Sequence, residues 1–295
     1  MPNPTDSVFV NLLHPGDFKS DVAISIAIQD LVSGRQDAAA TAWEIDEMII
    51  VEHQEEPQKP SGGQRYLWDC LGKVAMVVPH DHNSQNLLVA LLQQLQRLPR
   101  HRVPHKVGDE VVHKELWVLT PENKYDGLEQ WLWEIDQGFT GTQRQVKHVK
   151  SVEETASLYI NFSSFLARLL ASGVVETTRQ SALIRPSAFA TRNPETCLPE
   201  DYQPWASAAA QWVIYAGDAL YELCKKEVTT EIGKQKWTLS LWEEWKSKFE
   251  VAKSEKFSAK TRAFASAAFE KMGEAERNGV TTNVAVSFGF TSMKG

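Results

Sequence analysis

Apolar residues recur at the spacing of an α-helix along most of this 295-residue chain, and this periodicity constrains the fold more than any other feature. Strand-like alternation of apolar and polar residues is confined to a few short pieces. In residues 84–98, for example, all the leucines fall on one arc of about 140° when the sequence is plotted at 100° per residue. The pattern predicts an all-α protein: a single globular domain of about nine or ten helices.

The helix boundaries follow from apolar spacing and from helix start and stop signals. Helices are expected over residues 21–33, 37–53, 65–78, 84–98, 151–170 and 205–223, with two more around Trp242 and Phe264. Pro79 ends the third of these, because proline cannot donate the next helical hydrogen bond. Ser151 and Glu154 have the spacing of a capping box, and Ser258 is the expected N-cap of the last helix.

The remaining segments are expected to connect or flank these helices within one domain over residues 1–295. We assign an N-terminal arm to residues 1–20, a loop to residues 54–63 and a C-terminal tail to residues 279–295. Residues 107–120 lie in the least helical part of the chain, and there we expect a small irregular segment or a hairpin.

Composition argues against several classes of function. The formal net charge is −7, from 31 basic and 38 acidic residues, which opposes binding to nucleic acids or anionic membranes. The longest strongly apolar run, Leu87–Leu92, is far shorter than the roughly 20 residues that span a bilayer. The three cysteines are widely separated, so we expect no disulfide framework and no metal or other cofactor. A soluble, cytoplasmic protein is expected, with the nucleus left open.

The densest polar cluster lies at a predicted helix junction, in the sequence His80-Asp81-His82-Asn83. The two imidazoles could serve as metal ligands or as acids and bases, but a metal site needs a third protein ligand and none is near in sequence. The simpler interpretation is that Asp81, Asn83 or Ser84 caps the following helix. If the turn opens into a binding pocket, we expect the pocket to include the polar side chains of Asn161, Arg168 and Tyr215.

Other candidate sites have plain alternatives. Cys197 lies in a predicted loop, but no neighbouring histidine suggests an activated thiol, and Cys70 and Cys224 are expected in the core. Most of the tryptophans have helical spacing and are expected to pack in the core. Six basic residues form a local patch that could meet an acidic partner or simply be a solvated connector: Arg97, Arg100, His101, Arg102, His105 and Lys106.

Four separated elements of the sequence resemble a fungal family of helical proteins described as a domain of unknown function. They are the Pro-His-Asp-His turn that begins at Pro79, the sequence NFSSFLARL (161–169), the sequence AAQWVIYAGDALY (209–221) and the Trp-rich sequence WTLSLWEEWKSKF (237–249). The resemblance covers about residues 66–249 and implies a helical fold. It carries over no activity, cofactor or catalytic residue, so the catalytic residues, if any, are unknown.

Two hypotheses for the function remain open. We favour a non-catalytic protein-interaction or adaptor role, because no catalytic motif is recognisable and the helical surface is acidic. The alternative is an enzyme or small-molecule-binding protein of fungal secondary metabolism, which the polar turn at His80–Asn83 would serve.

Overall fold

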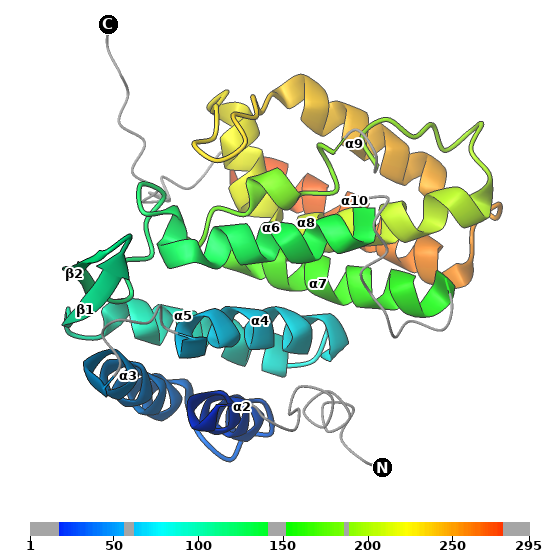
Figure 1. The fold of residues 1–295 in the computed structure, drawn as a ribbon. Helices are drawn as coiled ribbons and strands as arrows, with labels where there is room; N and C mark the ends of the chain where they lie inside the picture. The colour runs from blue at the N-terminus through cyan, green and yellow to red at the C-terminus, as the bar shows by residue number, and fades with distance from the viewer. Residues whose placement is uncertain (1–17, 56–61, 141–151, 186–188, 280–295) are drawn as a thin grey trace, which may run out of the picture. The chain divides into compact units, whose positions relative to one another are not determined.

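The computed structural model describes residues 18–55, 62–140, 152–185 and 189–279. Within these ranges the chain forms nine α-helices, two short 3-10 segments and one two-stranded antiparallel sheet (Figure 1). This confirms the all-α class, the expected number of helices and the presence of a small hairpin. No helix in the described ranges combines the length and the hydropathy that a membrane span requires.

The chain divides into two compact units, residues 1–165 and 166–295. Each unit is described by itself below, and the single domain over residues 1–295 stays a prediction. The predicted capping box at Ser151 falls outside the described residues, as do residues 1–17 of the arm and residues 280–295 of the tail.

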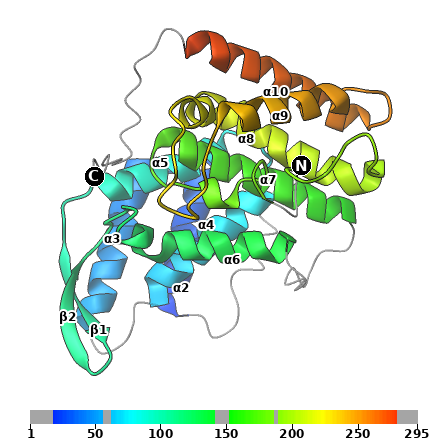
Figure 2. The same ribbon diagram turned by 90° about the horizontal axis from the view of Figure 1, so that it is seen from above.

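The described residues of unit 1 form five complete helices, one hairpin and the beginning of a sixth helix. Its elements are α2 (Lys19–Val32), α3 (Ala38–Glu55), α4 (Gly62–Val77), α5 (Ser84–Arg97), β1 (Arg102–Val107), β2 (Glu110–Glu115), α6 (Leu128–Thr140) and the first part of α7 (Val152–Ser172). Helix α3 packs against α2 and α5, α2 also packs against α4, and β1 lies along α3 (Figures 1 and 2).

Local sequence explains how these helices pack. In α5, Leu88, Leu91 and Leu95 are fully buried on one face, as their spacing predicts. Helix α4 approaches α6 closely at Gly72, where an added Cβ would lie 2.1 Å from Ile135 Cδ1. Only glycine fits this crossing without a shift of the neighbouring side chain.

The hairpin pairs β1 with β2 from Arg102↔Glu115 to Val107↔Glu110, and Gly108 adopts a φ of +62° in the turn. The predicted position, residues 107–120, is therefore shifted toward the C-terminus by several residues. The strands end where the chain turns away at Trp117, whose φ is +58°.

Helix α6 is absent from the helices expected from the sequence, although Leu128, Leu132 and Ile135 have helical spacing. The irregular segment expected from the sequence ends at residue 120, and no element was assigned to residues 128–140. The other expected helices are present, and α8 begins six residues earlier than expected, at Pro199.

In unit 2, residues 166–185 and 189–279 form the end of α7 and three further helices: α8 (Pro199–Lys225), α9 (Leu239–Ala252) and α10 (Ala259–Asn278). Helix α8 packs against both α9 and α10 (Figure 1). The side chains of Thr238 and Ser258 accept hydrogen bonds from backbone N–H groups at the starts of α9 and α10, which confirms the predicted cap at Ser258. Trp212, Trp242 and Trp245 are buried, as expected for core residues.

Candidate functional site: the polar base of the hairpin

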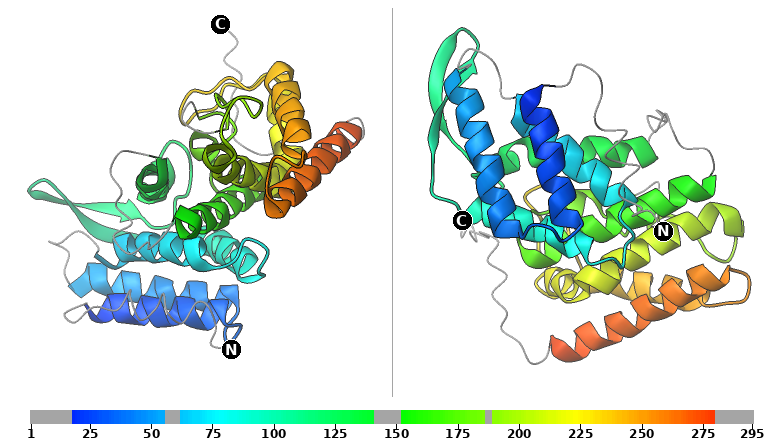
Figure 3. Two further views of the ribbon diagram at one scale, coloured as in Figure 1. Left: turned by 90° about the vertical axis from the view of Figure 1, so that its right-hand side faces the viewer. Right: turned by 90° about the horizontal axis from the view of Figure 1, so that it is seen from below.

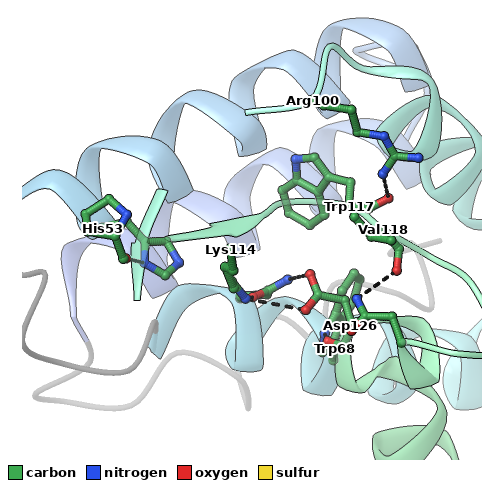
Figure 4. Close-up of polar contacts among 10 residues, drawn as sticks. His53, Trp68, Arg100, Lys114, Trp117, Val118 and Asp126 are labelled. Atoms are coloured by element: carbon green, nitrogen blue, oxygen red, sulfur yellow. Dashed lines mark hydrogen bonds and ion pairs between the residues drawn. The ribbon is translucent and has the colours of Figure 1, made fainter. Parts of the chain in front are cut away.

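The strongest convergence of polar side chains in unit 1 lies where the hairpin joins the helices, and Asp126 is at its centre (Figure 4). Gln64 Nε2 on α4 donates to Asp126 Oδ2 at 2.7 Å. Lys114 Nζ on β2 donates to Gln64 Oε1 at 2.6 Å and lies 3.4 Å from Asp126 Oδ1. The three side chains thus satisfy one another and tie the hairpin to α4. We call Gln64, Lys114 and Asp126 the hairpin-base triad.

A second carboxylate, Asp46 on α3, is only 1% exposed. Trp117 Nε1 donates to its Oδ1 at 2.7 Å, and His101 Nδ1 lies 3.0 Å from its Oδ2 (Figure 4 shows Trp117). A buried carboxylate is costly unless it is paired and hydrogen-bonded. These contacts therefore fix both ends of the hairpin to α3.

Two histidines meet between α3 and β1. His53 Nδ1 lies 2.9 Å from the carbonyl oxygen of Pro104, so Nδ1 carries the proton, because a carbonyl only accepts. The ring of His105 stands edge-on to that of His53, with centroids 6.1 Å apart. Burial, with smaller contributions from the charges of Lys114 and His105, lowers the pKa of His53, and burial and Lys114 lower the pKa of His105. Both rings are therefore neutral at neutral pH.

The backbone that carries Asp126 of the hairpin-base triad is strained. Lys124, Tyr125 and Asp126 adopt φ values of +48°, +53° and +54°, in the left-handed region that costs L-residues roughly 1–2 kcal/mol each. We call Lys124–Gly127 the left-handed turn. Such strain persists only where surrounding contacts impose it, and it clusters at functional sites.

Several contacts hold the left-handed turn and the strained residue Trp117. Trp68 Nε1 donates to the carbonyl oxygen of Asp126 at 3.1 Å, and the side chain of Tyr125 is 2% exposed. Arg100 Nη1 donates to the carbonyl oxygen of Trp117 at 3.0 Å (Figure 4). The strained backbone is thus anchored by the buried aromatic groups of Trp68 and Tyr125 and by the exposed Arg100.

A hollow of about 320 Å³ lies between β2 and the loop that leads into the left-handed turn. Residues from both strands and the loop line it: Arg102, His113, Lys114, Glu115, Val118, Asn123 and Asp126. Asn123 Nδ2 donates to the carbonyl oxygen of Val118 at 3.0 Å, which shapes the loop side of the hollow. Its volume is at the lower end of the range for small-ligand pockets.

The polar turn predicted from the sequence lies elsewhere in unit 1. The backbone N–H of His80 donates to Asn161 Oδ1 at 2.9 Å, and Asn161 Nδ2 donates to the carbonyl oxygen of Met76 at 2.9 Å. Ser164 Oγ donates to the carbonyl oxygen of His80 at 3.0 Å. The structure therefore brings His80 and Asn161 together, with the Asn161 side chain fastening the backbone of the turn.

The predicted cap of α5 is corrected. Asn83 occupies the N-cap position without a side-chain hydrogen bond to the helix start, and Asp81 is exposed. Instead, Ser84 N–H donates to Nδ1 of the exposed His82 at 3.2 Å. The Ser84 hydroxyl points away, since it donates to the carbonyl oxygen of Val32 at 2.6 Å.

Arg168 and Tyr215, the other two residues expected in a pocket with this turn, both belong to unit 2. The Arg168 guanidinium carbon lies 3.5 Å from the centroid of the Tyr215 ring, a cation–π contact between α7 and α8. A pocket that combines this pair with the His80–Asn83 turn stays a prediction.

The six basic residues of the predicted patch differ in their contacts, and Arg97 is exposed on the last turn of α5. Arg100, His101 and His105 are engaged at the hairpin base, as described above. Arg102 and Lys106 remain on the hairpin itself, at alternate positions of β1.

Two of the cysteines lie in the core, as expected. Burial raises the pKa of Cys70, and it raises the pKa of Cys224 to about 12, so both are inert core thiols. Cys197 is half-buried. Gly62 N–H donates to Glu52 Oε1 at 2.7 Å, so a carboxylate of the protein already occupies the start of α4. Among the described residues, no three His, Cys, Asp or Glu side chains gather as a metal site requires.

Sequence reasoning missed Gln64, Lys114, Trp117 and Asp126. Each comes from a different segment, and the contacts join residues 12 to 71 positions apart, so no local motif marks them. The one available signal is the Asp126-Gly127 dipeptide, which is typical of a turn.

These observations define a class of all-α protein that carries one small hairpin, fixed to its helices by a buried polar base. A family profile matches residues 68–249, and the chain belongs to that family, described as a protein of unknown function (DUF3632). The match confirms the family of unknown function expected from the sequence elements. No curated protein and no solved structure shows a significant match to the chain. Trp68, Lys114, Trp117 and Asp126 lie within the matched range, whereas Asp46, His53 and Gln64 precede it.

Proposed function

We propose that the protein has a protein-interaction role and that the β1–β2 hairpin is the element that contacts the partner. One observation carries this proposal: the tip of the hairpin exposes apolar side chains while its base is fixed. Val107, Val111 and Val112 are 58%, 40% and 38% exposed. Val107 and Val112 share one face of the hairpin, and Val111 lies on the other. Neighbouring exposed apolar side chains, unlike single ones, are typical of interaction sites.

The fixed base supports the proposal because a pre-organised element loses little conformational entropy on binding. The hairpin-base triad and Asp46 hold the root of the hairpin, and the tip stands out from the helices of unit 1 (Figure 3). The ionisable groups at the base are engaged with one another. This arrangement suits a rigid support better than acid–base chemistry on a substrate.

Site-specific photo-crosslinking tests the proposal. A photoreactive residue is introduced at Val111, and the matched control carries it at Leu239, which is 45% exposed at the start of α9. In a lysate of the source organism we expect a discrete crosslinked protein from Val111 that is absent from Leu239. Equal crosslinking patterns at the two positions would contradict the role of the hairpin.

A second candidate function, small-molecule binding, is favoured by the hollow beside the left-handed turn. Strained backbone next to a hollow of about 320 Å³ with charges of both signs is typical of a binding site for a small polar ligand. Native mass spectrometry of the gently isolated protein distinguishes small-molecule binding from the protein-interaction role. A retained small molecule that is lost in the Asn123→Leu variant would favour ligand binding over the interaction role.

A further inference from the structure

We infer that the outer edge of β2 binds an extended peptide segment of a partner protein, with acidic and apolar residues alternating, which adds a third strand to the hairpin. This inference rests on the proposed interaction role and names the kind of partner. It follows from the hydrogen-bond pattern of the hairpin, from the different protection of its two edges and from the charges on one of its faces.

The register determines which backbone groups point outward. Leu116 N–H donates to the carbonyl oxygen of His101 at 3.0 Å, so these two residues form a hydrogen-bonded pair. Because such pairs alternate along an antiparallel ladder, Val103–Lys114 and His105–Val112 are also hydrogen-bonded pairs. The intervening residues of β2 direct their N–H and C=O groups away from β1; they are Val111, His113 and Glu115.

The two edges of the hairpin differ in protection. On β1, the outward position 104 is a proline, which has no N–H, and its carbonyl oxygen lies 2.9 Å from His53 Nδ1. On β2, the outward positions contain no proline, and nearly the whole strand is exposed. Within the described residues the sheet has two strands, so no third strand pairs with β2.

Room for an added strand exists beside β2. The hollow described above is lined by His113, Lys114 and Glu115 on the strand side and by Asn123 and Asp126 on the other. A peptide that pairs with this edge would therefore enter a space that is already present. Strand addition of this kind takes its affinity from main-chain hydrogen bonds and its specificity from alternate side chains.

The charges on the hairpin indicate which side chains fit. Register places Arg102, Lys106, Val111, His113 and Glu115 on one face, together with Pro104. Arg102 and Lys106 have no ion-pair partner among the described residues, and Glu115, the one acid on this face, lies opposite Arg102. On this face the added strand would lie beside Val111, His113 and Glu115 of β2. Its acidic side chains would reach Arg102 and Lys106 across β2, which gives the face a net positive charge.

On the opposite face the added strand would lie beside Glu110, Val112 and Lys114 of β2. Lys114 is already engaged with Asp126, and Val112 is exposed, with the exposed Val107 diagonally across from it on β1. Residues of a β-strand alternate between faces, so a partner with acidic residues at every second position would place an intervening apolar residue against Val112.

The inference is tested with synthetic peptides and the full-length protein. The probe is an acetylated eight-residue peptide of alternating glutamate and valine, and binding is followed by amide shifts in the ¹⁵N-labelled protein. We expect the largest shifts at Val111, His113 and Glu115. A matched peptide with lysine in place of glutamate is expected to bind at least tenfold more weakly. Glutamate-peptide binding should also weaken as salt is raised.

A backbone variant separates strand addition from simple charge attraction. His113→Pro removes one outward N–H of β2, and the β1–β2 ladder is retained because His113 does not pair with β1 through hydrogen bonds. We expect at least tenfold weaker binding of the glutamate peptide by His113→Pro, and near wild-type binding by the matched control His113→Ala. If His113→Pro does not fold, a glutamate peptide that is N-methylated at alternate residues gives the same test with the wild-type protein.

Three results would overturn the inference: no shifts with millimolar peptide, equal binding of the N-methylated and unmodified peptides, or a wild-type dimer that becomes monomeric in His113→Pro. A dimer that is lost in His113→Pro would show that the outer edge of β2 mediates self-association. Crosslinking at Val111 separates these results from failure of the proposed function. A partner that still crosslinks there, while the edge tests fail, leaves the interaction role intact and removes only strand addition.

Discussion

Two polar regions of unit 1 differ in a way that neither composition nor motif reveals. The turn at His80–Asn83 concentrates polar residues in sequence, yet Asp81, His82 and Asn83 are exposed and the turn is held mainly through its backbone. The hairpin base has no local concentration of polar residues, but folding brings Gln64, Lys114 and Asp126 into one part-buried network. In this protein, the polar residues that are adjacent in sequence mark a junction between two helices. The polar residues that folding brings together in space form the candidate functional site.

The largest effect that would test this comparison is expected from Asp126→Ala. The change leaves Lys114 and Gln64 without their shared partner and places alanine at a left-handed position that aspartate tolerates better. We expect the free energy of unfolding to fall by about 3 kcal/mol in urea titrations. The matched control is Asp81→Ala in the exposed turn, which should change it by less than about 0.5 kcal/mol. Equal losses would remove the distinction between the two regions.

A smaller effect is expected where the turn does depend on a buried partner. Asn161→Ala leaves the N–H of His80 and the carbonyl oxygen of Met76 without this side chain, and we expect a loss of about 2 kcal/mol. Ser164→Ala removes one hydrogen bond to the same turn and should cost about 1 kcal/mol. Thermal unfolding of both variants measures the two losses of stability. A larger loss of stability from Ser164→Ala would contradict the conclusion that Asn161 is the side chain that contributes most to holding the turn.

Strain in the left-handed turn predicts a change of the opposite sign. Lys124 is exposed and has a φ of +48°, so Lys124→Gly should relieve strain and stabilise the protein by about 0.5–1 kcal/mol. The matched control is Glu47→Gly, at an exposed position within α3, which should cost about 1 kcal/mol. Urea unfolding measures the change in stability for both variants. If both substitutions destabilise the protein, the left-handed turn is not strained.

The smallest effect concerns pH. The unfolded chain titrates His53 and His105 near pH 6.5, and the native pKa values are lower. As pH falls below 6.5, the unfolded state takes up protons that the native state does not, so the free energy of unfolding decreases down to the native pKa values. We expect His105→Asn to show a smaller difference in stability between pH 7.5 and pH 5.5 than the wild type. Equal pH differences in the variant and the wild type would contradict the lowered pKa of His105.

Much of the fold was accessible from the sequence because its signals are local. The leucines of α5 and the cap at Ser258 are defined by residues within one or a few turns of each other. Helix α6 had the same kind of signal at Leu128, Leu132 and Ile135, and its omission was an error of interpretation rather than a lack of information.

The candidate site was not accessible in this way. Its central contacts join Gln64 to Asp126 and Asp46 to Trp117, 62 and 71 residues apart, and they depend on the packing of several helices. The positive φ values of non-glycine residues are equally invisible, because tertiary contacts impose them against local preference. The basic residues around Arg102 were visible in the sequence, but their separate contacts at the hairpin base, such as Arg100 with the carbonyl oxygen of Trp117, were not.

The long-range anchoring of the hairpin has a consequence for the order of events in folding. Contacts between residues far apart in the chain form only after the loop-closure entropy that opposes them has been overcome, so they tend to form late. The hairpin can form early by local pairing, but its orientation is fixed only when α3 and α4 are in place to supply Asp46 and Gln64. A partner that recognises the oriented hairpin would thereby distinguish the mature protein from its folding intermediates, and binding would report that maturation is complete.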